Sequence, residues 1–184
     1  GFVGLQTVEE RAFPMAIQNR LETGHVSTII RNLLLDTKEK RPDKYNELSD
    51  ILREKFSFNL KEASFNENSD IYVNSAYVEN VENRNVSFDF NSSGSGFMQV
   101  LQILTPIYRY CPEYSKIVLL DEPDAHLHPN LQVALADALH EIQRNLGIQI
   151  IISTHSTSII KKSDPSEIVP ISSGIKIAKP LSTE

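Results

Sequence analysis

Residues 117–123 read IVLLDEP, and further along the chain residues 148–155 read IQIIISTH. Each stretch is a short, largely apolar run that ends in polar residues. The first run ends in Asp121 and Glu122, and the second ends in His155. Short apolar runs with polar ends are typical of strands inside a sheet. The sequence therefore predicts two β-strands whose tips carry ionisable side chains.

The segment between these two runs has the periodicity of a helix. Apolar residues recur every three or four positions from Leu131 to Leu146. Pro129 precedes this pattern and Gly147 follows it, which is common at helix ends. Strand, helix and strand at this spacing predict a βαβ unit whose parallel strands are buried on both faces. Because parallel strands end at the same edge of a sheet, we expect the two polar tips to lie together there.

The N-terminal third of the chain has a helical pattern. Apolar residues follow a helical rhythm in residues 26–34 and 42–56, and Pro42 suits a first helical position. The polar residues 37–41 are predicted to join the two segments as a loop. A second polar stretch, residues 63–70, marks a boundary. We therefore expect a helical subdomain over residues 1–66 and an α/β lobe over residues 67–184.

The remaining segments predict short strands and one more helix. Residues 71–78 and 85–90 have the composition and alternation of a strand pair. Residues 97–108 predict an amphipathic helix that stops near Pro112. Residues 168–178 predict a last short hairpin. The fold class that follows is α/β, with a parallel sheet, a helical subdomain and an edge hairpin.

Composition narrows the class of protein. A length of 184 residues with 40% hydrophobic residues is enough for one domain with a core. The formal charge of −6 opposes non-specific binding to nucleic acid or to an anionic membrane. The single cysteine, Cys111, cannot form an internal disulfide, and no apolar run is long enough to span a bilayer. We therefore expect a soluble protein of a reducing, cytoplasmic compartment.

The residues at the strand tips suit nucleoside triphosphate hydrolysis. A carboxylate such as Asp121 can help to hold Mg²⁺, and a neighbour such as Glu122 can orient or deprotonate water. An imidazole such as that of His155 can donate a hydrogen bond to a terminal phosphate. The alternative is that these groups are only solvated ends of buried strands.

A third element precedes the helix predicted at residues 97–108. Residues 92–96 read SSGSG, and such a loop presents hydroxyls and backbone N–H groups at the positive end of a helix dipole. These groups could bind an anion. An ordinary flexible turn with a serine cap is the alternative.

In this order, the three elements resemble the second half of an ABC-type ATPase head. Residues 91–95 resemble its signature loop, residues 117–122 its Walker B strand with the adjacent glutamate, and His155 its switch histidine. The words DEPDAHLHP (residues 121–129) and STHS (residues 153–156) resemble the OLD-like and SMC-like branch rather than transporter subunits. Asn91 stands where that signature has leucine, and Ser93 stands where it has the first of two glycines, so the register of Ser92 against Ser93 is open.

The resemblance implies a partial P-loop NTPase fold that uses ATP and Mg²⁺. It implies that Asp121 serves the metal and that Glu122 and His155 are catalytic. Residues 125–128 take the place of the loop that crosses the dimer interface in that family. The cofactor-binding residues that the resemblance implies are Ser92, Ser93, Gly94, Asp124 and His126.

The sequence contains no G-x-x-x-x-G-K-[ST] phosphate-binding loop. We therefore expect the chain to be the C-terminal half of an ATPase domain, to act with an N-terminal half that carries Walker A, and to bind ATP poorly by itself. The resemblance further implies a second head as homodimer partner. It also implies an attached effector, such as a nuclease domain or bound nucleic acid, in DNA repair or phage defence.

Two other functions remain open. Residues 121–128 contain three acids and two histidines, which could serve a metal-dependent hydrolase. A catalytically inert interaction module on a degenerate ATPase fold would also account for the missing phosphate-binding loop.

Overall fold

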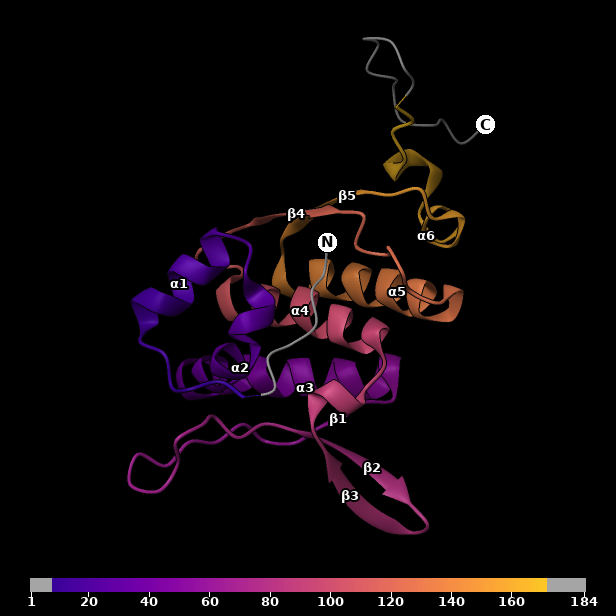
Figure 1. The fold of residues 1–184 in the computed structure, drawn as a ribbon. Helices are drawn as coiled ribbons and strands as arrows, with labels where there is room; N and C mark the ends of the chain where they lie inside the picture. The colour runs from indigo at the N-terminus through magenta and orange to yellow at the C-terminus, as the bar shows by residue number, and fades with distance from the viewer. Residues whose placement is uncertain (1–7, 172–184) are drawn as a thin grey trace.

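The computed structural model describes residues 8–171, which form helices and two small sheets (Figure 1). The helices are α1 (Pro14–Glu22), α2 (Ile30–Lys40), α3 (Pro42–Phe56), α4 (Ser95–Tyr110), α5 (Pro129–Leu146) and α6 (Thr157–Lys162). The strands are β1 (Asn59–Leu60), β2 (Tyr77–Val81), β3 (Arg84–Phe88), β4 (Ile117–Asp121) and β5 (Gln149–Ser153). Three short 3₁₀ helices are η1 (Val26–Thr28), η2 (Phe90–Ser92) and η3 (Pro165–Glu167). The predicted α/β class is confirmed.

The helical hairpin is formed by α2 and α3, but the predicted loop at residues 37–41 is wrong. Helix α2 continues to Lys40, so that Arg41 alone separates the two helices. Thr37 is buried, and its hydroxyl donates to the Leu33 carbonyl at 2.6 Å. Arg41 anchors the joint because its guanidinium donates to three carbonyls at the end of α4: those of Tyr108, Arg109 and Cys111. Helix α1 is an addition to the predicted elements.

One hydrophobic core joins the helical segment to the rest of the chain. Helices α2, α3, α4 and α5 contribute to it, with fully buried residues such as Leu48, Leu104 and Leu139. In Figure 1 the pair β4–β5 lies on one side of these helices and the β2–β3 hairpin projects from the other. The predicted division at residue 66 therefore falls within a shared core, and it stays a prediction.

The predicted strand pair is present with different bounds. Strands β2 and β3 are antiparallel, with Tyr77 opposite Phe88, and β1 adds a third short strand. Residues 71–76 lie outside any strand and make only isolated bridges, so this part of the prediction is wrong. The turn decides the register because Glu82 and Asn83 both have positive φ angles, 48° and 64°, as in the tight turns that favour hairpins.

The predicted βαβ unit is confirmed. Strands β4 and β5 are parallel neighbours, and α5 connects them from Pro129 to Leu146. Burial on both faces is wrong, however. Val118 and Ile150 pack against the core, whereas Leu119 is 73% exposed. Within residues 8–171, helices cover one face of this sheet, and the side chains on its other face point to solvent.

Gly147 ends α5 with a left-handed backbone (φ 62°), and a Cβ built on it would meet no other atom within 4 Å. Gly147→Ala should therefore lower the free energy of unfolding of the chain by about 1 kcal/mol, through backbone strain alone. Urea unfolding would measure this loss. Gly147→Asn should cost less, because asparagine tolerates this conformation better. Equal losses for both variants would contradict the explanation.

Part of the predicted C-terminal hairpin lies outside the described residues. Residues 168–171 form no strand, and residues 172–178 are beyond the described range. None of the helices described between residues 8 and 171 combines the length and apolar character needed to cross a membrane.

Candidate functional site

The tips of β4 and β5 meet at one edge of the sheet, as predicted. Asp121 lies opposite Ser153 in the strand register, and the Ser153 hydroxyl donates a hydrogen bond to the Asp121 carboxylate. The backbone N–H of Glu122 donates to the Ser153 carbonyl at 2.9 Å. Parallel pairing thus continues past the strands and fixes the acidic pair beside the turn that carries His155.

Glu122 and His155 approach each other at this edge. His155 Nε2 lies 3.5 Å from Glu122 Oε1, and the two side chains are 95% and 54% exposed. A contact between such exposed groups contributes little to stability. The contact between Glu122 and His155 is therefore not needed for the stability of the fold, and both side chains are accessible to a bound molecule.

The turn after β4 has an unusual backbone. Glu122 has a φ angle of 44° and His126 one of 67°, although neither is glycine. Non-glycine residues in this region carry a modest strain, and such positions concentrate at functional sites. The turn is held in place by Asp124, which is buried and accepts a hydrogen bond from the Thr154 hydroxyl at 2.5 Å. Asp124 thus ties the two polar turns together, and its predicted contact with a cofactor stays a prediction.

Two glutamines that the sequence analysis does not identify also hold the turns after β4 and β5 in place. Gln132, in the first turn of α5, donates to the Leu127 carbonyl at 3.0 Å and accepts from the Ser156 hydroxyl at 2.7 Å. Gln99, buried in α4, donates to the Pro123 carbonyl at 2.6 Å. A polar residue within the apolar stripe of α4 was the one signal that could have identified Gln99.

The histidines of residues 121–128 do not form a metal centre with the nearby acids. His128 caps α5, with Nδ1 accepting from the Asn130 N–H at 3.4 Å. Across residues 8–171, no three histidine, cysteine or acidic side chains are grouped so that they could hold a metal ion. The arrangement therefore gives no support to the metal-dependent hydrolase.

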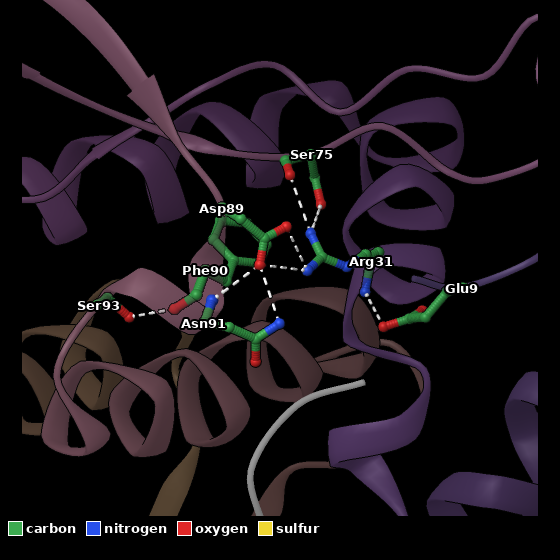
Figure 2. A network of polar contacts seen from close by, with 7 residues as sticks. All are labelled: Glu9, Arg31, Ser75, Asp89, Phe90, Asn91 and Ser93. Carbon is green, nitrogen blue, oxygen red and sulfur yellow. Dashed lines mark hydrogen bonds and ion pairs between the residues drawn. The ribbon is translucent and has the colours of Figure 1, made fainter. Parts of the chain in front are cut away.

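Residues 92–96, here called the serine–glycine loop, lead into α4, as predicted. Residues 90–92 form η2, Ser93 follows, and Gly94 is the residue that precedes the helix. Ser92 is exposed, whereas the Ser93 hydroxyl donates to the Phe90 carbonyl at 2.6 Å (Figure 2). Of the two serines whose register was open, Ser92 is thus the more accessible.

The start of α4 also packs against the segment that follows Asp121 and Glu122. A Cβ added to Gly96 would lie 2.9 Å from Leu131 Cδ1 and 3.1 Å from Leu127 Cδ2. Glycine thus allows the helix to approach the segment that follows Glu122 closely. Together with the hydrogen bond from Gln99, this contact joins the loop element to the acidic edge through packing.

Comparison with known proteins gives one family and one fold. Residues 5–161 match the family described as "AAA domain, putative AbiEii toxin, Type IV TA system". No curated protein matches the chain.

Solved structures of SMC ATPase heads resemble the chain. One is titled "Structural biochemistry of ATP-driven dimerization and DNA stimulated activation of SMC ATPases", with a TM-score of 0.57 and 14% identity over 80% of this chain and 87% of that one. Another is titled "Crystal structure of the SmcHead bound to the C-winged helix domain of ScpA", with a TM-score of 0.51 and 12% identity over 74% of this chain. The match spans 48%, about half, of the length of that second structure.

These likenesses confirm the expected SMC-like head at the level of fold, whereas the narrower OLD-like placement stays a prediction. The family match is the broader finding because it includes the serine–glycine loop, the acidic edge and His155 in one alignment. The chain therefore belongs to the AAA domain family described as "AAA domain, putative AbiEii toxin, Type IV TA system", and it has the fold of an SMC-type ATPase head.

Proposed function

We propose that this chain forms the part of an ATP-hydrolysing head that supplies the metal-binding carboxylate, the water-activating carboxylate and the phosphate-sensing histidine. The observation that carries the proposal is the parallel pairing of β4 with β5, which places Asp121, Glu122 and His155 at one sheet edge. Ligands of open α/β sheets bind at this kind of edge.

Asp121 suits a Mg²⁺ ion that arrives with ATP. Magnesium prefers oxygen ligands and keeps several waters, so it needs only one or two carboxylates from a protein. Asp121 provides such a carboxylate at an exposed strand end, where Ser153 orients it. When bound there, the ion would neutralise charge on the phosphate oxygens.

Glu122 and His155 have separate roles in hydrolysis: one acts on the water and the other on the terminal phosphate. Glu122 orients the attacking water and accepts its proton, a role that needs an accessible carboxylate in a fixed backbone. Its N–H bond to Ser153 and its left-handed φ angle supply that fixed backbone. His155, whose Nε2 lies near the Glu122 carboxylate, donates a hydrogen bond to the terminal phosphate.

The site is completed by other polypeptide. Parallel sheets normally have both faces covered, and here the face of β4–β5 that carries Leu119 is exposed. We propose that an N-terminal ATPase half covers this face and brings the phosphate-binding loop. Ser92, Ser93 and Gly94 then close over ATP held by a second head, and Asp124 and His126 lie in the turn nearest that interface. The resulting dimer would drive an attached effector, in DNA repair or phage defence.

ATP turnover by the full-length protein tests this proposal. His155→Ala should lower the rate of Mg-ATP hydrolysis at least tenfold, on the scale of a lost hydrogen bond to a charged group. His140→Ala is the matched control, because His140 also lies near a glutamate, 3.8 Å from Glu167, but on α5 away from the sheet edge. We expect the control to keep the rate of the unchanged protein.

Two outcomes would contradict the proposal. No turnover by the unchanged protein, with or without nucleic acid, would favour the inert interaction module. Equal losses for His155→Ala and His140→Ala would show that the sheet edge is not where hydrolysis takes place.

A further inference from the structure

Arg31 is a buried cation that belongs to none of the motifs described above. It lies in the first turn of α2 and is 2% exposed. Arg31 Nη1 donates to the Ser75 carbonyl at 2.9 Å, and Nη2 donates to both carboxylate oxygens of Asp89 at 2.9 and 3.1 Å (Figure 2). Burial of a charge is costly unless it is paired in this way, so the position of Arg31 fixes the position of Asp89.

Phe90 packs against the same guanidinium. Its ring is fully buried, and the ring centroid lies 5.0 Å from the guanidinium carbon of Arg31. A cation over an aromatic face adds attraction at short range. Arg31 therefore holds two consecutive residues, Asp89 by charge and Phe90 by packing.

Asp89 transfers this restraint to the serine–glycine loop. Its Oδ1 atom accepts from Arg31 and also from the backbone N–H and the side-chain amide of Asn91, both at 2.9 Å. Its carbonyl accepts from the Ser92 N–H at 2.9 Å. One carboxylate thus connects a helix turn 58 residues upstream in the chain to the beginning of the loop.

Phe90 continues the connection to the end of the loop. Its carbonyl accepts from both the backbone N–H and the hydroxyl of Ser93, at 3.0 and 2.6 Å. Gly94 follows directly and opens α4. The conformation of residues 91–94 therefore depends on where Asp89 and Phe90 are held.

The base of this arrangement is itself fixed. The Glu9 carboxylate accepts from the backbone N–H groups of Arg31 and Asn32, each at 3.0 Å, at the start of α2 (Figure 2 shows the first). Burial raises the pKa of Glu9, and these hydrogen bonds oppose that shift. Arg31 thus projects from a helix end whose own position is restrained.

We propose that Arg31, acting through Asp89, is a positioning residue that holds residues 91–94 ready to meet the nucleotide of a partner head. The inference rests on the proposed function and adds a residue to it. Ordering a loop on association lowers affinity, so a loop that is already ordered favours the dimer. Loss of the Arg31–Asp89 pair should therefore weaken ATP-dependent pairing of heads and leave the chemistry of a formed dimer intact.

The experiment measures ATP turnover by the full-length protein as a function of protein concentration. For Arg31→Gln and for Asp89→Asn, we expect the concentration that gives half-maximal turnover to rise about tenfold. Turnover per head at high concentration should stay within about twofold of the unchanged protein. Arg31→Lys keeps the charge, but it cannot contact the Ser75 carbonyl and the Asp89 carboxylate with two separate nitrogens. Its concentration for half-maximal turnover should therefore lie between that of the unchanged protein and that of Arg31→Gln. Arg53→Gln, which breaks an exposed pair with Asp50, is the charge-matched control and should change nothing.

Mixing variants tests whether the loop acts on the partner's nucleotide. A dimer of one Arg31→Gln head and one Glu122→Gln head contains one site with an intact loop and an intact acidic edge. At concentrations at which Arg31→Gln alone turns over little ATP, mixing it with Glu122→Gln should therefore raise turnover above the sum of the two separate proteins. A merely structural role of Arg31 would damage its own head and would give no such gain.

The outcomes separate this inference from the proposed function. If the unchanged protein does not hydrolyse ATP, the proposed function fails. If it does, and the concentration dependence of Asp89→Asn equals that of the unchanged protein, the positioning role is wrong while the proposed function stands. Because the Asp89 side chain is half-exposed, Asp89→Asn tests the inference even if Arg31→Gln fails to fold.

Discussion

Glu122→Gln is expected to lower the turnover of Mg-ATP by the full-length protein about 10²- to 10⁴-fold, the usual contribution of a positioned proton acceptor. Glutamine has the same shape as glutamate but cannot take a proton from water. The backbone of the turn should persist, because it is held by the Glu122 N–H rather than by the side chain. Steady-state phosphate release would measure the loss.

The same variant should keep binding ATP and pairing with a second head. Sedimentation in the presence of Mg-ATP would show this, since dimers that cannot complete hydrolysis should accumulate. Glu167→Gln is the matched control: Glu167 is also an exposed acid near a histidine, but it lies in η3. If Glu122→Gln hydrolyses ATP as fast as the control, Glu122 takes no part in the hydrolysis step.

Arg109→Met should lower the free energy of unfolding by about 3–5 kcal/mol, the range seen when one partner of a buried ion pair is removed. Arg109 on α4 and Asp36 on α2 are 6% and 5% exposed, and Arg109 Nε lies 2.5 Å from Asp36 Oδ2. The variant leaves a buried carboxylate whose other oxygen contacts Lys40 at 2.7 Å. Urea unfolding of the chain would measure the loss.

Replacement of both partners should be much less harmful. Asp36→Leu combined with Arg109→Met removes the buried carboxylate that has lost its buried partner and fills the space with apolar groups, so most of the lost stability should return. Arg53→Met breaks an exposed pair with Asp50 and should cost less than about 1 kcal/mol. A double variant as unstable as Arg109→Met would show that the loss of stability comes from packing rather than from the buried Asp36 carboxylate left without Arg109.

The βαβ unit and its polar tips could be predicted because their signals are local. A strand that ends in Asp121 and Glu122, a helix between Pro129 and Gly147, and a strand that ends near His155 are each defined by neighbouring residues. Parallel pairing then follows from general rules of connection. The prediction that the tips meet needed no knowledge of distant contacts, and it is confirmed by the Glu122–His155 approach.

The residues that orient the site were not predictable in the same way. Arg31 and Asp89 are 58 residues apart, and Gln132 matters only because Ser156 and Leu127 come within reach of its amide. Such contacts depend on tertiary packing, which leaves no periodic signal. The predicted loop at residues 37–41 failed for a related reason, since a polar composition does not show that Arg41 will bind the end of α4.

The open face of β4–β5 has a practical consequence. Leu119 and its half-exposed neighbours Ile117 and Ile151 form an exposed apolar stripe on β4 and β5, and within residues 8–171 no further strand pairs with the outer edge of either strand. Exposed apolar surfaces and open strand edges of this kind promote aggregation when nothing covers them. Co-production with the N-terminal half proposed above to cover this face should therefore raise the yield of unaggregated protein more than any substitution at Asp121 or Glu122.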